Sequence, residues 1–418
     1  MNVEIITIGT ELLIGQVVDT NSAWMGTELN LAGFDVTRKT TIPDSGAAIQ
    51  SAITEALGRV SIVLVTGGLG PTKDDITKQT LCELFGTTLV FDQTVYEDME
   101  RLLKGRVTQI NGLNRSQAMV PKDCTVIRNP VGTAPIMWFN RQGKVLVAMP
   151  GVPSEMQQAM EHEVIPRLKQ QFATGVILHK TILVAQLPES VLAERIAHWE
   201  DKLDPALSLA YLPSPGKVRL RLTAKGEKEQ ELAQLIEKAV EELKPIIGDY
   251  IFGYDDEQPQ EEVGRILALR RQTLSVAESC TGGYIAHLIT GVPGSSSYFK
   301  GGVVAYSNEV KVGLLGVDPQ MLERYGAVSQ PVVEQMALGA QRVLQTDYAI
   351  ATSGIAGPMG GSEEKPVGTV WMAWATPEGV FSKKFQFGTI RGRNILRSGE
   401  TALILLQQYL NGVLTITD

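Results

Sequence analysis

The sequence predicts an α/β protein, in which two α/β domains with mainly parallel sheets are joined by a small α+β module. Strand-like and helix-like segments alternate over residues 1–172. The pattern changes to three strand signals and two helix signals over 173–253, and alternation resumes over 258–418. Such alternation is typical of a mostly parallel sheet covered by helices on both faces.

In the first domain, short apolar runs alternate with helix-like segments, and several of these helices end at glycine. We expect strands at 3–8, 35–40 and 60–66, and helices at 22–31, 47–57 and 75–85. Gly33 and Gly86 follow two of the helices, and glycine is the preferred residue at a left-handed helix end. A turn-rich segment at 149–155 then leads to a helix that ends near Gln171.

The middle module has a different pattern. We expect a strand at 180–186, a helix at 189–199, a hairpin of strands 207–212 and 217–224, and a charged amphipathic helix at 227–243. The acidic segment 253–260 has no apolar periodicity and is predicted to be a linker. A long helix at 261–271 then opens the third domain.

A candidate site in the third domain lies where strand-like runs stop and helix-like runs begin. Ser279 stands at one such corner, within Ala-Glu-Ser-Cys-Thr-Gly-Gly, and Tyr306 and Lys311 stand at the next. A third, glycine-rich corner spans 352–358. The carboxyl ends of parallel strands meet at one edge of a sheet, where ligands bind. We therefore expect these corners to converge.

Serine, tyrosine and lysine together predict an amidase that works without histidine. In this hypothesis Lys311, kept partly neutral by burial, takes the proton of Ser279 directly or through Tyr306. The N–H groups of Gly282 and Gly283 would stabilise the oxyanion. The alternatives are structural: a serine that caps a helix, a solvated helix lysine and a core tyrosine.

The three cysteines, Cys82, Cys124 and Cys280, are scattered and indicate neither a disulfide framework nor a metal site. A reduced cytoplasm fits this usage. Cys280 is a rival nucleophile to Ser279. We rank it lower because no histidine is close in sequence and a lone cysteine is usually buried packing.

The glycine-rich loop 354–368 is a candidate phosphate site, since its N–H groups and Lys365 can surround an anion. Arg391 and Arg393, before the last helix, are candidate phosphate partners. The alternative is a flexible connection between the strands 347–351 and 369–375.

Four runs in this domain, at 277–283, 306–311, 326–337 and 352–371, closely resemble the CinA C-terminal domain. That family includes nicotinamide mononucleotide deamidases, which release ammonia and nicotinic acid mononucleotide. The resemblance implies an amidase that needs no cofactor, with Ser279, Tyr306 and Lys311 as catalytic residues. It implies these substrate-binding residues: Thr281, Gly282, Gly283, Ser353, Gly354, Gly357 and Arg393.

A second candidate site is the segment 66–77, Thr-Gly-Gly-Leu-Gly-Pro-Thr-Lys-Asp-Asp-Ile-Thr, which follows an apolar strand and opens a helix. Its glycines allow the backbone to close on a diphosphate, and its acids can hold Mg²⁺ or a similar cation. Asp44 is the second carboxylate that we hypothesise for this cation. Asp74 and Asp75 have an alternative role as helix caps, and Asp44 as a turn residue.

This segment resembles the molybdopterin-binding family, and the runs 9–16 and 150–156 narrow the resemblance to the CinA N-terminal domain. Some relatives are metal-dependent ADP-ribose pyrophosphatases. The resemblance implies a divalent cation at Asp44 and Asp75. It implies substrate contacts from Thr66, Gly67, Gly68 and Gly70. The middle module looks KH-like, but 213–216 replaces its GxxG loop, so we do not expect RNA binding.

The sequence thus predicts a bifunctional cytoplasmic enzyme that acts on nicotinamide mononucleotide and ADP-ribose. The net charge of −8, from 38 Lys+Arg against 46 Asp+Glu, argues against strong nucleic-acid binding. No apolar run is long enough for a membrane span. We expect a homodimer, since related folds commonly pair symmetrically. The alternative function is a non-catalytic nucleotide- or pterin-binding adaptor linked to competence or the DNA damage response.

Overall fold

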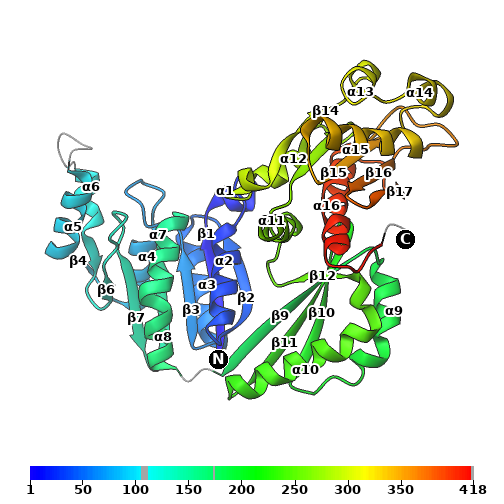
Figure 1. Cartoon of the computed structure of the whole chain (residues 1–418). Coiled ribbons are helices and arrows are strands. Elements are labelled where there is room, and N and C mark those ends of the chain that lie inside the picture. The colour runs from blue at the N-terminus through cyan, green and yellow to red at the C-terminus, as the bar shows by residue number, and fades with distance from the viewer. Residues whose placement is uncertain (105–111, 173–174, 416–418) are drawn as a thin grey trace. The chain divides into compact units, whose positions relative to one another are not determined.

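The computed structural model describes residues 1–104, 112–172 and 175–415 (Figure 1). This part of the chain divides into two compact units. The first comprises Met1–Leu178 and Lys225–Leu232, and the second comprises His179–Ala224 and Ala233–Asp418. The predicted fold class is confirmed: α/β domains with parallel and mixed sheets precede and follow a small α+β module in the sequence.

The main sheet of the first unit has the strand order β2-β1-β3-β8-β7-β6, in which β2, β1, β3 and β8 are parallel. β7 and β6 are antiparallel additions, and β4 pairs with β5 in a separate sheet. The strands are β1 Asn2–Ile8, β2 Asp35–Ile42, β3 Ile62–Thr66, β4 Leu89–Phe91, β5 Met119–Pro121, β6 Thr125–Ile127, β7 Ile136–Arg141 and β8 Lys144–Met149. The helices are α1 Thr10–Leu13, α2 Thr20–Leu31, α3 Gly46–Arg59, α4 Thr77–Phe85, α5 Gln93–Leu103, α6 Gly112–Gln117, α7 Pro153–Ala159, a π-helical turn Met160–Val164 and α8 Ile165–Gln171.

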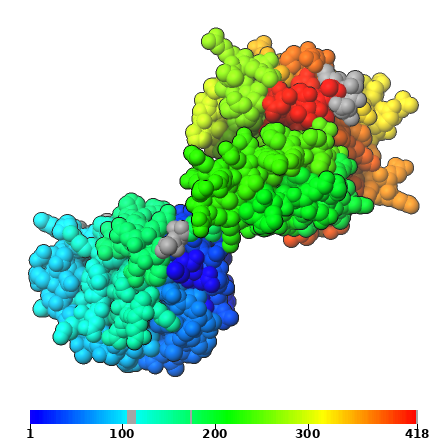
Figure 2. Space-filling view, turned by 90° about the horizontal axis from the view of Figure 1, so that it is seen from below, coloured from blue at the N-terminus to red at the C-terminus, as the bar shows by residue number. Residues whose placement is uncertain are grey.

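Both faces of this sheet are covered, as the alternation along β1 requires. Val3 and Ile5 pack into a core with α2 and α7, whereas Ile6 and Ile8 pack into another core with α3. Every residue of β1 after Asn2 is buried. The start of the chain, deep blue in Figure 2, reaches the surface of the first unit at Met1, which is 43% exposed.

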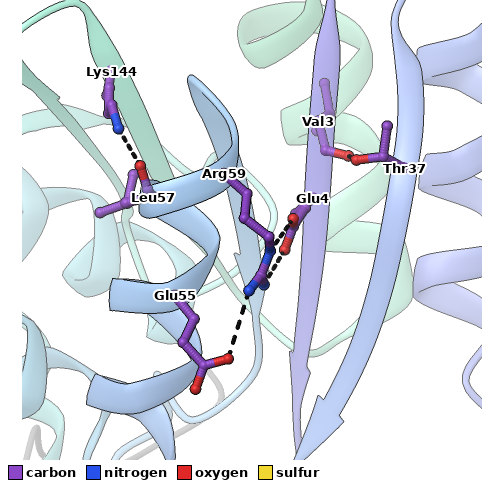
Figure 3. A network of polar contacts seen from close by, with 7 residues as sticks. All are labelled: Val3, Glu4, Thr37, Glu55, Leu57, Arg59 and Lys144. Atoms are coloured by element: carbon purple, nitrogen blue, oxygen red, sulfur yellow. Dashed lines mark hydrogen bonds and ion pairs between the residues drawn. The ribbon is translucent and has the colours of Figure 1, made fainter.

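A partly buried ion pair fixes α3 to β1 (Figure 3). Arg59, in the last turn of α3, donates from Nε and a terminal nitrogen to the two carboxylate oxygens of Glu4, each at 2.8 Å. Glu55 lies 3.5 Å from the same guanidinium. Lys144 of β8 donates to the Leu57 carbonyl, so the C-terminal end of α3 is held from both sides. These contacts hold the last turn of α3 against the sheet.

The middle module has the strand order β10-β11-β9-β12. Its elements are β9 Val176–Ala185, α9 Glu189–Glu200, β10 Leu207–Ser214, β11 Lys217–Gly226, α10 Glu229–Ile247, a 3₁₀ turn Gly248–Tyr250 and β12 Ile251–Tyr254. The predicted linker 253–260 is shorter than expected, because Gly253 and Tyr254 belong to β12, which pairs with β9. Pro259 begins the next helix, where its missing N–H has no consequence.

The C-terminal sheet has the strand order β14-β13-β15-β16-β17. β14, β13 and β15 are parallel, and β16 and β17 are antiparallel additions. The strands are β13 Leu274–Glu278, β14 Phe299–Val304, β15 Tyr348–Gly354, β16 Thr369–Thr376 and β17 Gly379–Gln386. The other elements are α11 Pro259–Arg270, α12 Tyr284–Thr290, a 3₁₀ turn Ser295–Ser297, α13 Asn308–Gly313, α14 Pro319–Tyr325, α15 Gln330–Leu344 and α16 Arg391–Leu410.

Side-chain size distinguishes the two faces of this sheet. Toward α15 the strands present alanines, among them Ala277, Ala351 and Ala373, which let the helix approach closely. Toward α11, α12 and α16 they present larger residues such as Val276 and Trp374. The parallel strands therefore end together between two helical layers, and the predicted site residues follow those ends. No helix within the described ranges is long and apolar enough to cross a membrane.

Candidate functional site

Ser279 and Lys311 contact each other directly. Ser279 follows β13, and Lys311 lies in α13, after the neighbouring parallel strand β14. The Lys311 amine donates to Ser279 Oγ at 3.2 Å and to the Ala305 carbonyl at 2.7 Å, with the Tyr306 carbonyl at 3.4 Å. The convergence predicted for these two corners is therefore present in the structure.

Lys311 is only 1% exposed. Burial lowers the pKa of its amine below the ordinary value, while the acidic groups of Cys280 and Glu309 oppose that change. No carboxylate pairs with this amine among the described residues. A larger fraction of the amine is thus neutral near neutral pH, and a neutral amine can accept a proton.

Tyr306 does not lie between Ser279 and Lys311, where a proton relay would need it. Its side chain is 62% exposed, and its hydroxyl accepts a hydrogen bond from Arg391 at 3.0 Å. Arg391 also donates to the Gly357 carbonyl at 3.2 Å. The direct route from Ser279 to Lys311 therefore matches the geometry, and Tyr306 lies with Arg391 at the exposed mouth of the site.

The N–H groups of Gly282 and Gly283 are not free to donate to an oxyanion, contrary to the prediction. Gly282 donates to the Ser279 carbonyl at 3.2 Å. Gly283 donates to the Glu278 carboxylate at 3.0 Å. Both glycines have positive φ, which closes the turn on itself.

No oxygen accepts a hydrogen bond from the N–H groups of Cys280 and Thr281 in the described part of the chain, and the Cys280 N–H interacts only with its own thiol. They follow Ser279 directly. The backbone N–H after a nucleophile is a position from which oxyanion donors act. These two groups replace the glycines as the candidate oxyanion donors.

Glu278, directly before Ser279, is a buried residue of the candidate site that sequence reasoning did not single out. It is fully buried, and its carboxylate accepts hydrogen bonds from the N–H groups of Gly283, Ile285 and Ala286 at 2.8 to 3.1 Å. A carboxylate is favourable at the start of a helix, where N–H groups lack partners. An acidic residue at the end of a strand and just before a helix was the available signal.

Cys280 is unsuited to be the nucleophile. It is buried, and burial raises the pKa of its thiol to about 12. Since the thiolate is the reactive form, almost none is present at neutral pH. The structure thus supports ranking Ser279 above Cys280.

The third corner, at 352–358, holds the loops of the site together through buried hydrogen bonds. Ser353, 1% exposed, donates to the Ala327 carbonyl at 2.7 Å. Thr281 and Thr352 share a buried hydrogen bond of 2.7 Å between their hydroxyls. A Cβ at Gly354 would collide with β16. The hydroxyls of Thr281 and Ser353 are therefore committed to holding the loops together.

Loop 354–368 is positioned by α16. Asn394, 1% exposed, donates to the carbonyls of Ala356 at 2.9 Å and Gly388 at 2.8 Å. Gly357 has a φ of 89°, and a Cβ there would meet Val367. Arg393 is exposed in the first turn of α16, and no hydrogen bond or ion pair holds it within the described ranges. Sequence reasoning missed Asn394 because a single asparagine in a helix gives no signal.

The second candidate site forms at the carboxyl ends of β1, β3 and β8. Thr66 donates to the Pro150 carbonyl at 2.7 Å, and Asn21 donates to the Gly151 carbonyl at 2.8 Å. Gly67 has a φ of 111°, and a Cβ there would collide with the Ile8 carbonyl. A Cβ at Gly68 would collide with Thr77, and one at Gly70 with Asp75. The positive φ favours glycine at Gly67 and Gly68, and the backbone clash excludes other residues at Gly67, whereas at Gly70 the contact is with a side chain that can move.

Asp44 and Asp75 each accept hydrogen bonds from a different nearby threonine. Asp44 accepts from the Thr10 N–H at 2.9 Å and its hydroxyl at 3.1 Å. Asp75 accepts from the N–H of Thr72 at 2.9 Å and from its hydroxyl. Within the described residues, no group of three His, Cys, Asp or Glu forms a metal site. Two carboxylates suit a hard cation when water molecules and phosphate oxygens complete its ligands.

Lys78, one turn after Asp75, is a buried cation that sequence reasoning did not identify. Its amine donates to the carbonyl and the side-chain oxygen of Gln117 at 2.9 and 3.2 Å. Burial lowers its pKa to about 8, while Asp75 opposes the change. The tertiary fold alone buries this amine, so its pKa has no signature in the sequence.

Comparison with known proteins agrees with this organisation. Family models described as a probable molybdopterin binding domain, a damage-inducible protein CinA KH domain and a CinA C-terminal domain match residues 4–170, 179–253 and 256–410. The chain is 44% identical to a CinA-like protein from Cytophaga hutchinsonii, with 98% of each chain covered. It is 45% identical to a CinA-like protein from Flavobacterium psychrophilum, with 98% of this chain and 99% of that protein covered.

Among solved structures, a competence-damaged protein (CinA) superfamily protein from Klebsiella pneumoniae is 32% identical. It covers 37% of this chain and 96% of its own, with a TM-score of 0.36. The full-length identity to the CinA-like proteins is the decisive finding. The chain belongs to the CinA family.

Proposed function

We propose that the C-terminal domain hydrolyses the carboxamide of nicotinamide mononucleotide to nicotinic acid mononucleotide and ammonia. The observation that supports this proposal most is the contact of 3.2 Å between Ser279 Oγ and the buried amine of Lys311. A serine paired with a desolvated lysine is an activated nucleophile for acyl transfer. The choice of substrate rests on the sequence motifs of the domain.

The surroundings of Lys311 orient its amine toward Ser279. In the neutral state the amine directs N–H groups at the carbonyls of Ala305 and Tyr306, which leaves its lone pair for the Ser279 hydroxyl. The amine takes the hydroxyl proton as Oγ forms a bond to the carboxamide carbon. The N–H groups of Cys280 and Thr281 then donate to the oxyanion.

The same proton completes the reaction. Lys311, now an ammonium, returns it to the carboxamide nitrogen as the C–N bond breaks and ammonia leaves. Water then attacks the ester on Ser279, and Lys311 takes a proton from that water and returns it to Oγ. The carboxylate product leaves, and no group of the protein is consumed.

The experiment that tests this proposal measures ammonia and nicotinic acid mononucleotide from nicotinamide mononucleotide with Lys311 variants. Lys311→Met removes the base, and we expect a loss of at least about a hundredfold in kcat, in line with general-base catalysis. Lys300→Met, at an exposed lysine of β14, is the matched control. Equal turnover by Lys311→Met and the control would refute the mechanism.

We propose that the N-terminal domain cleaves ADP-ribose with the help of a divalent cation. The glycine loop and Asp75 follow β3, and Asp44 follows β2, at the carboxyl ends of parallel strands in one sheet, an arrangement that favours a diphosphate ligand. Asp44 and Asp75 would hold the cation jointly with the diphosphate, and the cation would neutralise charge on the phosphate oxygens.

Removal of one carboxylate tests this second activity. Asp75→Asn keeps an acceptor for Thr72, so the loop is retained while the charge is lost. We expect metal-dependent release of AMP from ADP-ribose to fall and ammonia release to stay unchanged. An unaltered rate of AMP release would remove Asp75 from the site.

A non-catalytic adaptor is the alternative proposal, in which the N-terminal loop binds a nucleotide or pterin without turnover. Calorimetry with nucleotides and with DNA separates it from the enzyme. DNA affinity without turnover of either substrate would favour the adaptor.

A further inference from the structure

A cavity lies within the second unit, outside the amidase site. It has a volume of about 580 Å³ and is bordered by the end of β17, the tip of the β10–β11 hairpin and α16. We call it the β17 pocket. The residues that line it include Lys217, Lys383, Lys384, Phe385, Phe387 and Arg397. Cavities of this size commonly hold small ligands.

The β17 pocket concentrates positive charge on an acidic protein. Four cations, Lys217, Lys383, Lys384 and Arg397, border it together with one carboxylate, Glu189, although the net charge of the chain is −8. Lys217 is paired with Glu400 at 3.1 Å. Within the described ranges, no carboxylate lies within ion-pair distance of the other three cations. Cations that outnumber the carboxylates around a pocket favour an anionic ligand.

The pocket also offers planar groups. The rings of Phe385 and Phe387 are stacked, with centroids 5.7 Å apart and planes 8° from parallel. The guanidinium of Arg397 lies over the Phe387 ring, 4.9 Å from its centroid, at a distance typical of a cation–π contact. Its Nε is buried and has no hydrogen-bond partner in the described chain. Aromatic rings beside cations are the combination that nucleotides use, with a base to stack and phosphates to neutralise.

The pocket adjoins the support of the amidase site through a shared helix. Arg397 and the pocket residue Thr401 follow Arg391 and Asn394 along α16. None of Ser279, Tyr306 and Lys311 lines the pocket. A ligand in the pocket would therefore contact the helix that positions loop 354–368 without occupying the site of the reaction.

We propose that the β17 pocket binds a nucleoside diphosphate, with its phosphates near Lys383 and Arg397, its base against Phe385, and Lys384 adding positive charge at the edge of the strand. The limited volume favours a single nucleotide over a nucleic-acid strand. The assignment is independent of the proposed amidase and pyrophosphatase activities.

Calorimetric titration of the full chain with ADP tests this assignment. We expect a binding event that the double variant Lys383→Glu, Lys384→Glu weakens by at least about tenfold, since the contact of Lys383 with phosphate is lost and the charge along this edge is reversed. Both lysines are exposed on an edge strand, so the fold tolerates the change. Lys300→Glu on the other edge strand, β14, is the matched control and should leave the event unchanged. Ser279→Ala should leave it unchanged too.

Several outcomes would overturn the assignment. The first is an ADP isotherm that is the same for the double variant and the wild type, as it would be if ADP bound only in the N-terminal domain. The second is tripolyphosphate binding as tightly as ADP, or Phe385→Ala binding ADP normally, since either would show that the base makes no contact. The third is tighter binding of an oligothymidylate that the double variant abolishes, which would make the occupant a nucleic acid.

Discussion

Lys311 combines two properties that a solvated lysine lacks. Its amine is buried, and its hydrogen bonds to backbone carbonyls leave Ser279 as the side-chain partner. Burial favours the neutral amine, and the carbonyls fix its direction. The motif made Lys311 a candidate base. Its contact with Ser279, however, depends on the pairing of β13 and β14, which the sequence does not show directly.

The pKa of Lys311 predicts the pH dependence of the amidase. Because burial lowers this pKa and the reaction needs the neutral amine, activity should be lost as pH falls through that pKa and should level off above it. The measurement is kcat/KM for nicotinamide mononucleotide across the neutral range. A rate that falls with rising pH over this range would contradict a neutral lysine base.

Cys280 gives a second prediction at the same scale. With a thiol pKa near 12, it contributes packing and not nucleophilicity. Cys280→Ala should therefore retain ammonia release within a few-fold of wild type, with a small loss of stability from the cavity. Complete loss of turnover in a folded Cys280→Ala protein would reopen the choice of nucleophile.

At the scale of elements, the turn between β13 and α12 depends on one buried carboxylate. Glu278 holds the N–H groups of Gly283, Ile285 and Ala286, which are the groups that a helix start leaves without partners. By engaging them it shapes the turn and leaves the N–H groups of Cys280 and Thr281 for a ligand.

Removal of this carboxylate should cost both stability and activity. Glu278→Ala leaves buried N–H groups without acceptors and should lower the free energy of unfolding of the second unit by roughly 3 kcal/mol. Glu278→Gln retains one acceptor oxygen and should lose less. Urea denaturation of the two variants measures the difference, and equal stability of Glu278→Ala and wild type would refute the role of Glu278.

The sequence indicated the elements better than their interactions. Strand ends and helix starts at the site were predictable, since apolar runs stop at hydroxyls and glycines there. The N–H of Gly283 could donate to a ligand or to Glu278, and side-chain packing decides between them. Such packing leaves no periodic pattern in the sequence. For the same reason, the contacts of Arg391 with Tyr306 and Gly357 were not foreseen.

At the scale of the whole molecule, the predicted architecture of α/β domains around a small α+β module is confirmed. The extent of the linker was not predictable, because the short strand β12 draws Gly253 and Tyr254 into the middle sheet through pairing with distant β9. The two candidate sites lie in separate units. Both are formed by loops at the carboxyl ends of parallel strands. Two chemically unrelated reactions are thus proposed for one chain.

The most direct test is to assay both reactions with one full-length preparation of wild type and of Ser279→Ala. We predict that the substitution abolishes formation of ammonia and nicotinic acid mononucleotide and leaves metal-dependent cleavage of ADP-ribose intact. Ammonia release at the wild-type rate by Ser279→Ala would contradict the amidase site, and loss of both reactions in a folded variant would contradict two independent sites.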